Sequence, residues 1–411
     1  MVADLSKQRA VARGVFDAGV ACADPYKAVQ SALQARPLAG PAPLVIAVGK
    51  AAVRMARAAQ AVLPAVGDVL IVTNYENATE VPGATVFAAG HPVPDENGAA
   101  AADAVCTALS QAQGQVLALI SGGGSALLPA PVDGIALAEK AAVNAALLAS
   151  GADIVTMNLI RQQLSRLKGG GMLRLAAPAQ VRALILSDVV GDDLRAIASG
   201  PTVAPLGTAE MARATLQDLG LWDQMPASVQ AHLGRSVEPQ PLPEAENELI
   251  GSNALSLNAM AQAAPEAVVF PDPLEGDVSD AAEKVISFAQ GPGIYLFGGE
   301  TTVHLAGDGR GGRNQELALR VALLAEQHGW TDWVYLQGGT DGRDGPTDAA
   351  GGLVDAGTLT HARAAGCDVQ AMLANNDSYA VLQAADDLLI TGATGTNVAD
   401  LGVLIRWSGG K

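Results

Sequence analysis

The chain has 411 residues, which is long enough for two or three domains with sizeable cores. Its formal net charge is −17 and no basic run offsets this field, which argues against nucleic acid and anionic membrane as partners. Hydrophobic residues make up 49% of the chain but aromatic residues only 3%, because alanine carries much of the total, so we expect α/β layers packed by alanine, valine and leucine.

Cysteine usage and hydropathy favour a cytoplasmic protein. The three cysteines, Cys22, Cys106 and Cys367, lie far apart without metal-ligand spacing and are expected to stay reduced. The best apolar runs have only strand length, and the first 25 residues carry charges without an apolar signal-sequence core. The sequence therefore predicts neither a membrane span nor a secretion signal.

Strand and helix patterns alternate in the first half of the chain. A helical stretch over 5–33 is expected to break at Asp24-Pro25, because proline suits the start of a helix. Buried apolar runs predict strands at 44–48, 68–73, 85–89, 116–120 and 181–186. Helical spacing predicts helices at 51–63, 97–112, 134–150 and 153–167.

The pattern weakens between about residues 206 and 249, where Pro239, Pro241 and Pro243 gather, so a domain boundary is predicted there. The expected domains are 1–238 and 245–411. Strands of the second are predicted at 248–250, 267–270, 293–297, 301–305, 333–337 and 388–391. Helices between most of them indicate a mixed sheet covered by helices.

Lys50 follows a predicted buried strand and Gly49, and it directly precedes a predicted helix. The helix dipole disfavours an ammonium group at that end, so the position is unusual for a structural lysine. A lysine that merely extends to solvent is the alternative. The position is not that of a Walker A lysine, because Ala51 follows it and the upstream glycine frame is absent.

A glycine loop follows the strand predicted at 116–120. Its residues supply bare backbone N–H groups and two hydroxyls, which suits an anion: Ser121, Gly122, Gly123, Gly124 and Ser125. A plain strand-to-helix turn would have needed only one glycine. His91 could act as a ligand or base, although the prolines after it favour a rigid turn.

Two further sites of the first half carry charge beside glycines. Asp188 and Asp192 follow the strand predicted at 181–186, where an α/β enzyme holds Mg²⁺ through one or two carboxylates, unless they are simply solvated loop acids. Lys168 precedes three glycines, where a basic side chain ordinarily complements the end of a helix.

In the second half, residues 298–316 combine a strand pattern, a loop with four glycines, Arg310, Arg313 and the start of a helix predicted at 314–326. Glycines let backbone N–H groups approach a ligand, and the helix start adds partial positive charge, so a phosphate or carboxylate is expected. The loop formally matches the dinucleotide fingerprint G-x-G-x-x-G, which is a weak match in a chain with 46 glycines. Two more glycine loops, 338–348 and 391–397, also carry Asp, Thr or Asn.

These motifs together resemble the class II glycerate kinases, whose C-terminal part is a MOFRL-type domain. In the first half the likeness is carried by GHPVPDENG (90–98), LISGGGSALL (119–128), LSRLKGGG (164–171), SDVVGDD (187–193) and SGPTV (199–203). In the second half it is carried by GGETTV (298–303), GGRNQELAL (311–319), GTDGRDGPTDAAGG (339–352), NNDSY (375–379) and TGATGTNVADL (391–401). Ten long motifs in one order over nearly the whole chain form a specific signal.

The resemblance implies two α/β domains: a larger, Rossmann-like three-layer N-terminal domain, and a smaller mixed-sheet C-terminal domain, with the active site in the cleft between them. It implies ATP-dependent phosphorylation of D-glycerate at the 2-hydroxyl with Mg²⁺, giving 2-phosphoglycerate and ADP. Lys50 and Arg313 are expected to face the cleft and to stabilise transition-state charge. Asp188 or Asp192 is expected to hold the metal or take the hydroxyl proton.

Substrate and nucleotide contacts are expected from the loop 121–125 and from Lys168, Glu300, Gly309, Gly312, Asn314, Asp341, Asp344, Thr347, Asp348, Asn376, Thr394, Thr396 and Asn397. The division of ATP and glycerate between the two glycine loops is left open, as is a homodimer. An NAD(P)H-dependent hydroxypyruvate reductase is the main rival function, and a non-catalytic sugar-acid sensor is a second.

Overall fold

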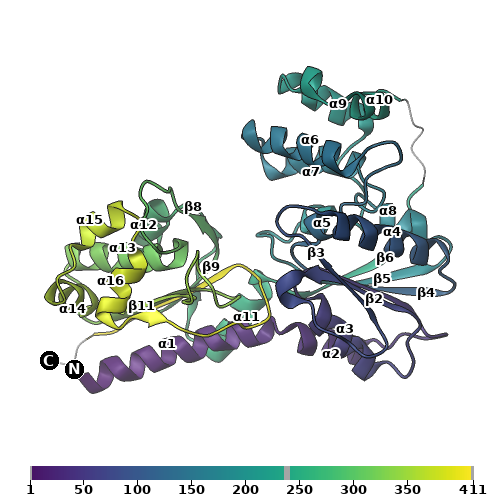
Figure 1. Ribbon diagram of the computed structural model, residues 1–411. Coiled ribbons are helices and arrows are strands. Elements are labelled where there is room, and N and C mark those ends of the chain that lie inside the picture. The colour runs from purple at the N-terminus through teal and green to yellow at the C-terminus, as the bar shows by residue number, and fades with distance from the viewer. Residues whose placement is uncertain (1, 236–240, 409–411) are drawn as a thin grey trace. The chain divides into compact units, whose positions relative to one another are not determined.

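The computed structural model describes residues 2–235 and 241–408 of the chain. Contacts divide the chain into two compact units (Figure 1). We call the first, residues 25–250, the central unit; the second joins residues 1–24 to residues 251–411, and we call it the terminal unit. No helix in the described ranges combines the length and apolar composition that a bilayer crossing requires.

The central unit is built on a six-stranded sheet. Its order is β3 (Thr85–Ala89), β2 (Val69–Asn74), β1 (Leu44–Val48), β4 (Gln115–Ile120), β5 (Gln180–Leu186) and β6 (Ala245–Gly251). Strands β3 to β5 pair in parallel. Their residues are mostly valine, leucine, isoleucine and alanine because a parallel sheet is buried on both faces.

Helices cover both faces of this sheet (Figure 1), which confirms the predicted three-layer arrangement. Helices α2 (Pro25–Ala35) and α3 (Ala52–Val62) pack together on one side. Helices α4 (Glu96–Ser110) and α8 (Gly171–Ala176) pack on the other, where Val105 and Leu173 join the core formed by the strands. The short helix α5 (Gly124–Leu127) begins directly after β4.

A second, purely helical layer belongs to the central unit. It consists of α6 (Leu137–Ala149), α7 (Ile154–Gln163), α9 (Ala209–Asp218) and α10 (Ala227–Leu233). These helices share their own apolar core, in which Leu147, Ile160, Leu216 and Val229 are fully buried. This core explains why the region after residue 206 shows no strand pattern even though it remains part of the central unit.

The sheet of the terminal unit is mixed, as predicted, and has seven strands. Its path is β12 (Leu388–Leu389), β11 (Gly351–Asp355), β10 (Trp333–Gly339), β13 (Asp400–Arg406), β9 (Gly293–Thr302) and β7 (Val268–Val269), while β8 (Leu274–Asp277) also pairs with β9. Strands β7 and β8 run parallel to β9, and the pairs from β12 to β9 are antiparallel.

Helices also cover both faces of the second sheet. Helices α1 (Val2–Cys22) and α11 (Asn253–Ala263) share an apolar core with one face, in which Phe16 and Met260 are fully buried. The other face is covered by α12 (Val278–Phe288), α13 (Arg313–Gln327), α14 (Thr358–Ala364), α15 (Val369–Ala374) and α16 (Ser378–Ala385). A side chain at Gly19 would collide with Leu401 and Met260, so α1 lies directly on the sheet and on α11.

The predicted division into 1–238 and 245–411 differs from this structure at two points. Residues 1–24 pack with the C-terminal part, because α1 covers β10 and β13. Strand β6, predicted at 248–250 as part of the second sheet, instead forms the edge of the first sheet beside β5. The chain therefore leaves the central unit after Ile250 rather than near residue 238, and Pro239 lies outside the described residues.

The two predicted strands at 293–297 and 301–305 are one strand, β9, which continues through Gly298 and Gly299. A side chain at Gly299 would lie less than 3.0 Å from the backbone of Leu274, so glycine is what allows β8 to pair here. The residues after Thr302 form a loop in which Leu305 is 75% exposed, so its apolar character does not signal a buried strand.

Candidate active site

The carboxyl ends of β1, β4 and β5 lie side by side because these neighbouring strands are parallel. Lys50, the loop 121–125 and Asp188 follow these three ends. Open α/β sheets bind ligands at this edge. The structure therefore brings together three of the groups that the sequence singles out.

Backbone hydrogen bonds fasten the first two loops to each other. The N–H of Lys50 donates to the carbonyl oxygen of Gly122 at 2.9 Å, and the N–H of Ser121 donates to that of Val48 at 2.9 Å. Ser121 Oγ accepts from the N–H of Ala51 at 3.1 Å. Gly49 has φ of 117° and would collide with Ser121 if it carried a side chain, so only glycine fits between the loops.

Three functional side chains surround the glycine loop. A Cβ atom at Gly122 would lie less than 3.0 Å from Asp188 Oδ2, and one at Gly123 would lie 3.2 Å from His91 Cδ2 and 3.4 Å from Lys50 Cγ. The glycines thus leave space that is flanked by an ammonium, an imidazole and a carboxylate. A phosphoryl group needs such a combination of exposed N–H groups and positive charge.

Burial and Lys50 set the protonation of the neighbouring groups. Burial raises the pKa of Asp188 above its usual value, although a hydrogen bond from its own backbone and the charge of Lys50 oppose the shift. Burial and the charge of Lys50 together lower the pKa of His91. Asp188 is therefore a stronger proton acceptor than an exposed aspartate, and His91 is a neutral imidazole at pH 7.

Replacing Gly122 by alanine is expected to lower kcat/KM by about ten- to hundredfold, because the new methyl group must push the Asp188 carboxylate away from the loop. Steady-state kinetics and thermal melting of the variant test this. Gly14→Ala is the matched control, since a Cβ atom there meets nothing within 4 Å. If both variants had the same kcat/KM, the position of the Asp188 carboxylate beside the loop would not matter for the reaction.

The loop after β5 contains a carboxylate oxygen that could bind a metal ion. Asp192 Oδ1 is buried and lacks a hydrogen-bond partner, which leaves a hard carboxylate oxygen free for a cation. In residues 2–235 and 241–408 no group of three or more His, Cys, Asp or Glu side chains gathers as a complete metal cage.

Lys168 is not the helix-end lysine that its sequence position suggests. Helix α7 ends at Gln163, and Lys168 is 5% exposed. Its ammonium donates to Ser125 O at 2.6 Å and to Ser125 Oγ at 2.9 Å. Ser125 Oγ lies 2.8 Å from Ser199 Oγ, which in turn donates to Asn158 Oδ1 at 2.9 Å. A polar chain thus runs from α7 to the glycine loop.

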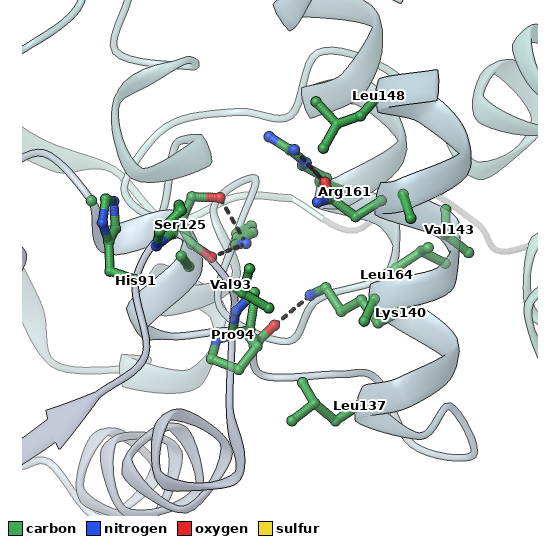
Figure 2. Close-up of a pocket in the computed structure, with 18 residues that line it drawn as sticks. His91, Val93, Pro94, Ser125, Leu137, Lys140, Val143, Leu148, Arg161 and Leu164 are labelled. Atoms are coloured by element: carbon green, nitrogen blue, oxygen red, sulfur yellow. Dashed lines mark hydrogen bonds between the residues drawn. The ribbon is translucent and has the colours of Figure 1, made fainter. Parts of the chain in front are cut away.

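A cavity of about 390 Å³ opens beside this chain of hydrogen bonds. Figure 2 shows Arg161 and Lys140 extending into it from α7 and α6, with Ser125 and His91 on the opposite side. Val93, Pro94, Leu148 and other apolar side chains complete the wall.

In the terminal unit, Arg313 is part of an ionic cluster at the start of α13. Its guanidinium bonds Asp400 in bidentate fashion at 2.6 and 3.0 Å and pairs with Glu300 at 3.2 Å. Asp400 is 2% exposed and also accepts from Asn314 Nδ2 at 3.0 Å. Sequence reasoning did not single out Asp400, although it lies in the quoted motif TGATGTNVADL.

The anion at the start of α13 is a side chain of the protein. Asp344 accepts hydrogen bonds from the N–H groups of Asn314 at 3.2 Å and Gln315 at 2.8 Å. A side chain at Gly312 would collide with Asp344, and one at Gly307 or Gly309 would collide with residues 375–377. The glycines of the nominal G-x-G-x-x-G thus permit close packing of the chain on itself. A bound phosphate at this loop stays a prediction.

The stability of the terminal unit is expected to fall as pH rises from about 4 to 6. Burial raises the pKa of Asp344 from 3.8 to about 6, so in this window the folded chain holds a proton that the unfolded chain releases. Urea unfolding at several pH values measures the effect. Asp344→Asn should remove this part of the pH dependence, and an identical pH dependence in the variant would contradict the assignment.

The other predicted residues of the terminal unit make mostly internal contacts. Asn376 Oδ1 accepts from the N–H groups of Ala306 and Gly307, and Thr347 Oγ1 accepts from Gln315 Nε2. Thr396 donates to Ala23 O, which ties the loop 391–397 to the end of α1. Asp341 and Asn397 accept from nearby backbone N–H groups of their own loops, Asp348 accepts from Tyr379 Oη on α16, and Thr394 donates to Thr340 O. The cleft predicted to join Lys50 to Arg313 stays a prediction.

Comparisons with known proteins confirm the resemblance. The model of a domain of unknown function, DUF4147, matches residues 11–234, and that of the MOFRL family matches residues 293–400. The chain is 38% identical to "Glycerate 2-kinase" of Pyrococcus horikoshii, covering 94% of each chain, and 40% identical to "D-glycerate 2-kinase" of Thermotoga maritima, covering 87% of this chain and 89% of that one. It is also 41% identical to an Agrobacterium vitis protein called "Putative hydroxypyruvate reductase", covering 97% of this chain and 94% of that one.

A crystal structure of glycerate kinase from Thermotoga maritima superimposes with a TM-score of 0.91 at 37% identity, covering 98% of this chain and 100% of that chain.

Proposed function

Because the chain belongs to the DUF4147 and MOFRL protein family that includes glycerate 2-kinases, we propose that it transfers the γ-phosphoryl group of ATP to the 2-hydroxyl of D-glycerate. The products are 2-phosphoglycerate and ADP. The observation that carries the proposal is the pair Lys50 and Asp188 on either side of the bare glycine loop. This arrangement supplies charge and a proton acceptor at one edge of the sheet.

Each group of the site has its own role in phosphoryl transfer. The glycerate 2-hydroxyl oxygen attacks the γ-phosphorus, the bond from that phosphorus to the β-phosphate oxygen breaks, and a carboxylate takes the hydroxyl proton. Lys50 stabilises charge on the transferring group, and the N–H groups of residues 122–125 bind phosphate oxygens. Asp188 and Asp192 share the roles of proton acceptor and Mg²⁺ ligand. Mg²⁺ would neutralise phosphate charge when bound.

We further propose that Arg313 and Glu300 of the terminal unit take part in the reaction, as the resemblance implies. Neither unit alone contains both Lys50 and Arg313. The wider site would then draw on Gly309, Gly312, Asn314, Asp341, Asp344, Thr347, Asp348, Asn376, Thr394, Thr396 and Asn397.

The rival reductase has support in the name of the Agrobacterium vitis relative. Against it, a side chain at Gly307, Gly309 or Gly312 would collide with residues 375–377 or with Asp344, so close packing accounts for the dinucleotide-like glycine pattern without a bound dinucleotide. A coupled assay separates the two: ADP should form from ATP and D-glycerate, and NADH should not be consumed with hydroxypyruvate. NADH oxidation without ADP formation would overturn the kinase, and inactivity in both assays would favour a sensor.

A further inference from the structure

Three basic side chains converge on the cavity of the central unit without an acidic partner. The cavity is lined by Lys140, Arg161 and Lys168 but by no aspartate or glutamate. None of the three takes part in an ion pair within the described ranges of the chain. Lys140 is 8% and Lys168 5% exposed. Burying cations without counter-ions costs free energy, so the arrangement is typical of an anion-binding site.

The contacts of these groups leave donors available. Lys140 donates to Pro129 O, Lys168 donates to the two oxygens of Ser125, and Arg161 bonds Asn144 Oδ1 through Nε and one terminal nitrogen. All these partners are neutral oxygens. The second terminal nitrogen of Arg161 has no partner in the described structure, so an incoming phosphate oxygen finds an unoccupied charged donor.

Most of the remaining wall is apolar. Val93 and Pro94 come from the segment after β3, and Val143 and Leu148 come from α6 (Figure 2). D-Glycerate is a small polar acid and has almost no apolar surface to bury against such a wall. A purine base has a large apolar face, and a volume of about 390 Å³ lies in the range of pockets that take ligands of that size.

We propose that this cavity holds the nucleotide, with the base between the 92–94 segment and α6 and the phosphates extending past Arg161 and Lys168 to the glycine loop. The proposal rests on the kinase function and deepens it, because it assigns ATP to the loop 121–125 and adds Lys140 and Arg161 to the site. The cavity reaches the loop at Gly123 and Ser125, beside Lys50. The γ-phosphate can therefore lie where Lys50 and Asp188 meet.

Proton uptake supports the same assignment. Burial and the charge of Arg161 lower the pKa of Lys168 to about 7, so near pH 8 much of the unliganded protein has a neutral amine there. A phosphate beside the amine stabilises its charged form, so binding should draw a proton from solution. Burial and the charges of Lys168, Arg161 and Arg166 lower the pKa of Lys140 as well.

The test is calorimetric titration of the full chain with ADP, which requires no turnover. Arg161→Met should raise the Kd for ADP by about ten- to hundredfold, as expected for a lost charge-assisted bond to phosphate. Lys168→Met should reduce the proton uptake seen at pH 8 in buffers of different ionisation enthalpy. Leu148→Asp, at a position 57% exposed on the cavity rim, should weaken ADP binding by repulsion.

Val155→Asp is the matched control, because Val155 is 52% exposed on α7 and does not line the cavity. The proposal is overturned if all variants bind ADP as the unmodified protein does, if inorganic phosphate alone binds as tightly as ADP, or if Arg161→Met raises KM only for D-glycerate. If the cavity variants lose ADP binding but the unmodified protein does not phosphorylate D-glycerate, the kinase function is rejected and the nucleotide site stands.

Discussion

Replacing Lys50 by methionine is expected to lower kcat by about a thousandfold or more, as when an enzyme loses a charged group that stabilises a transferring phosphoryl group. Methionine keeps most of the length of the side chain and removes its charge. The backbone of Lys50, not its side chain, bonds Gly122, so the loop should keep its shape. Initial rates with saturating Mg-ATP and D-glycerate measure the effect.

Thermal melting with and without Mg-ATP separates binding from chemistry in this variant. Stabilisation by the nucleotide should persist while turnover is lost. This result would show that Lys50 stabilises the transition state and is not needed for nucleotide binding. Lys284→Met serves as control, because Lys284 is exposed on α12. Near-normal turnover in Lys50→Met would remove this residue from the catalytic group.

Replacing Arg313 by alanine is expected to reduce kcat by roughly a hundredfold and, in addition, to lower the free energy of unfolding by about 3–5 kcal/mol. A residue at a loop-helix junction would ordinarily be dispensable for folding. Here, however, its removal leaves the Asp400 carboxylate buried with Asn314 as its one remaining side-chain donor in the described structure. Urea unfolding and steady-state kinetics measure the two losses.

The exposed pair Arg363 and Glu326 provides the comparison. Both side chains are 48% exposed, so Arg363→Ala should cost less than about 1 kcal/mol. If Arg313→Ala lowered the free energy of unfolding by no more than Arg363→Ala does, the bond between Arg313 and Asp400 would not stabilise the fold. If only its kcat remained normal, Arg313 would be structural and would have no part in the reaction.

Sequence patterns predicted the strands of the central sheet well. Strand β1 has the predicted bounds, because a parallel strand that is buried on both faces is a continuous apolar run. The pattern failed at β13, the strand between β9 and β10, where Gly402 interrupts the apolar run. Tyr335 Oη and Gln337 Oε1 occupy the space that a side chain at Gly402 would need. That requirement comes from neighbouring strands and cannot be read from the segment itself.

The same distinction applies to the candidate site. Lys50, the loop 121–125 and Asp188 could be found because each directly follows a recognisable buried strand. Lys140 and Arg161 could not, because a basic residue on a helix usually faces water. Their place beside the cavity depends on how α6, α7 and the segment after β3 are arranged, which only the tertiary structure provides.

Helix α1 has a consequence for biosynthesis. It emerges from the ribosome before the central unit, yet the sheet that it covers needs β13, which is made after that unit. The whole central unit, residues 25–250, is synthesised in between and can fold as soon as it is complete. During that interval the apolar side of α1, including Phe16, has no native partner. Nascent chains halted before residue 400 should therefore bind chaperones through this helix, even when their central unit already resists protease.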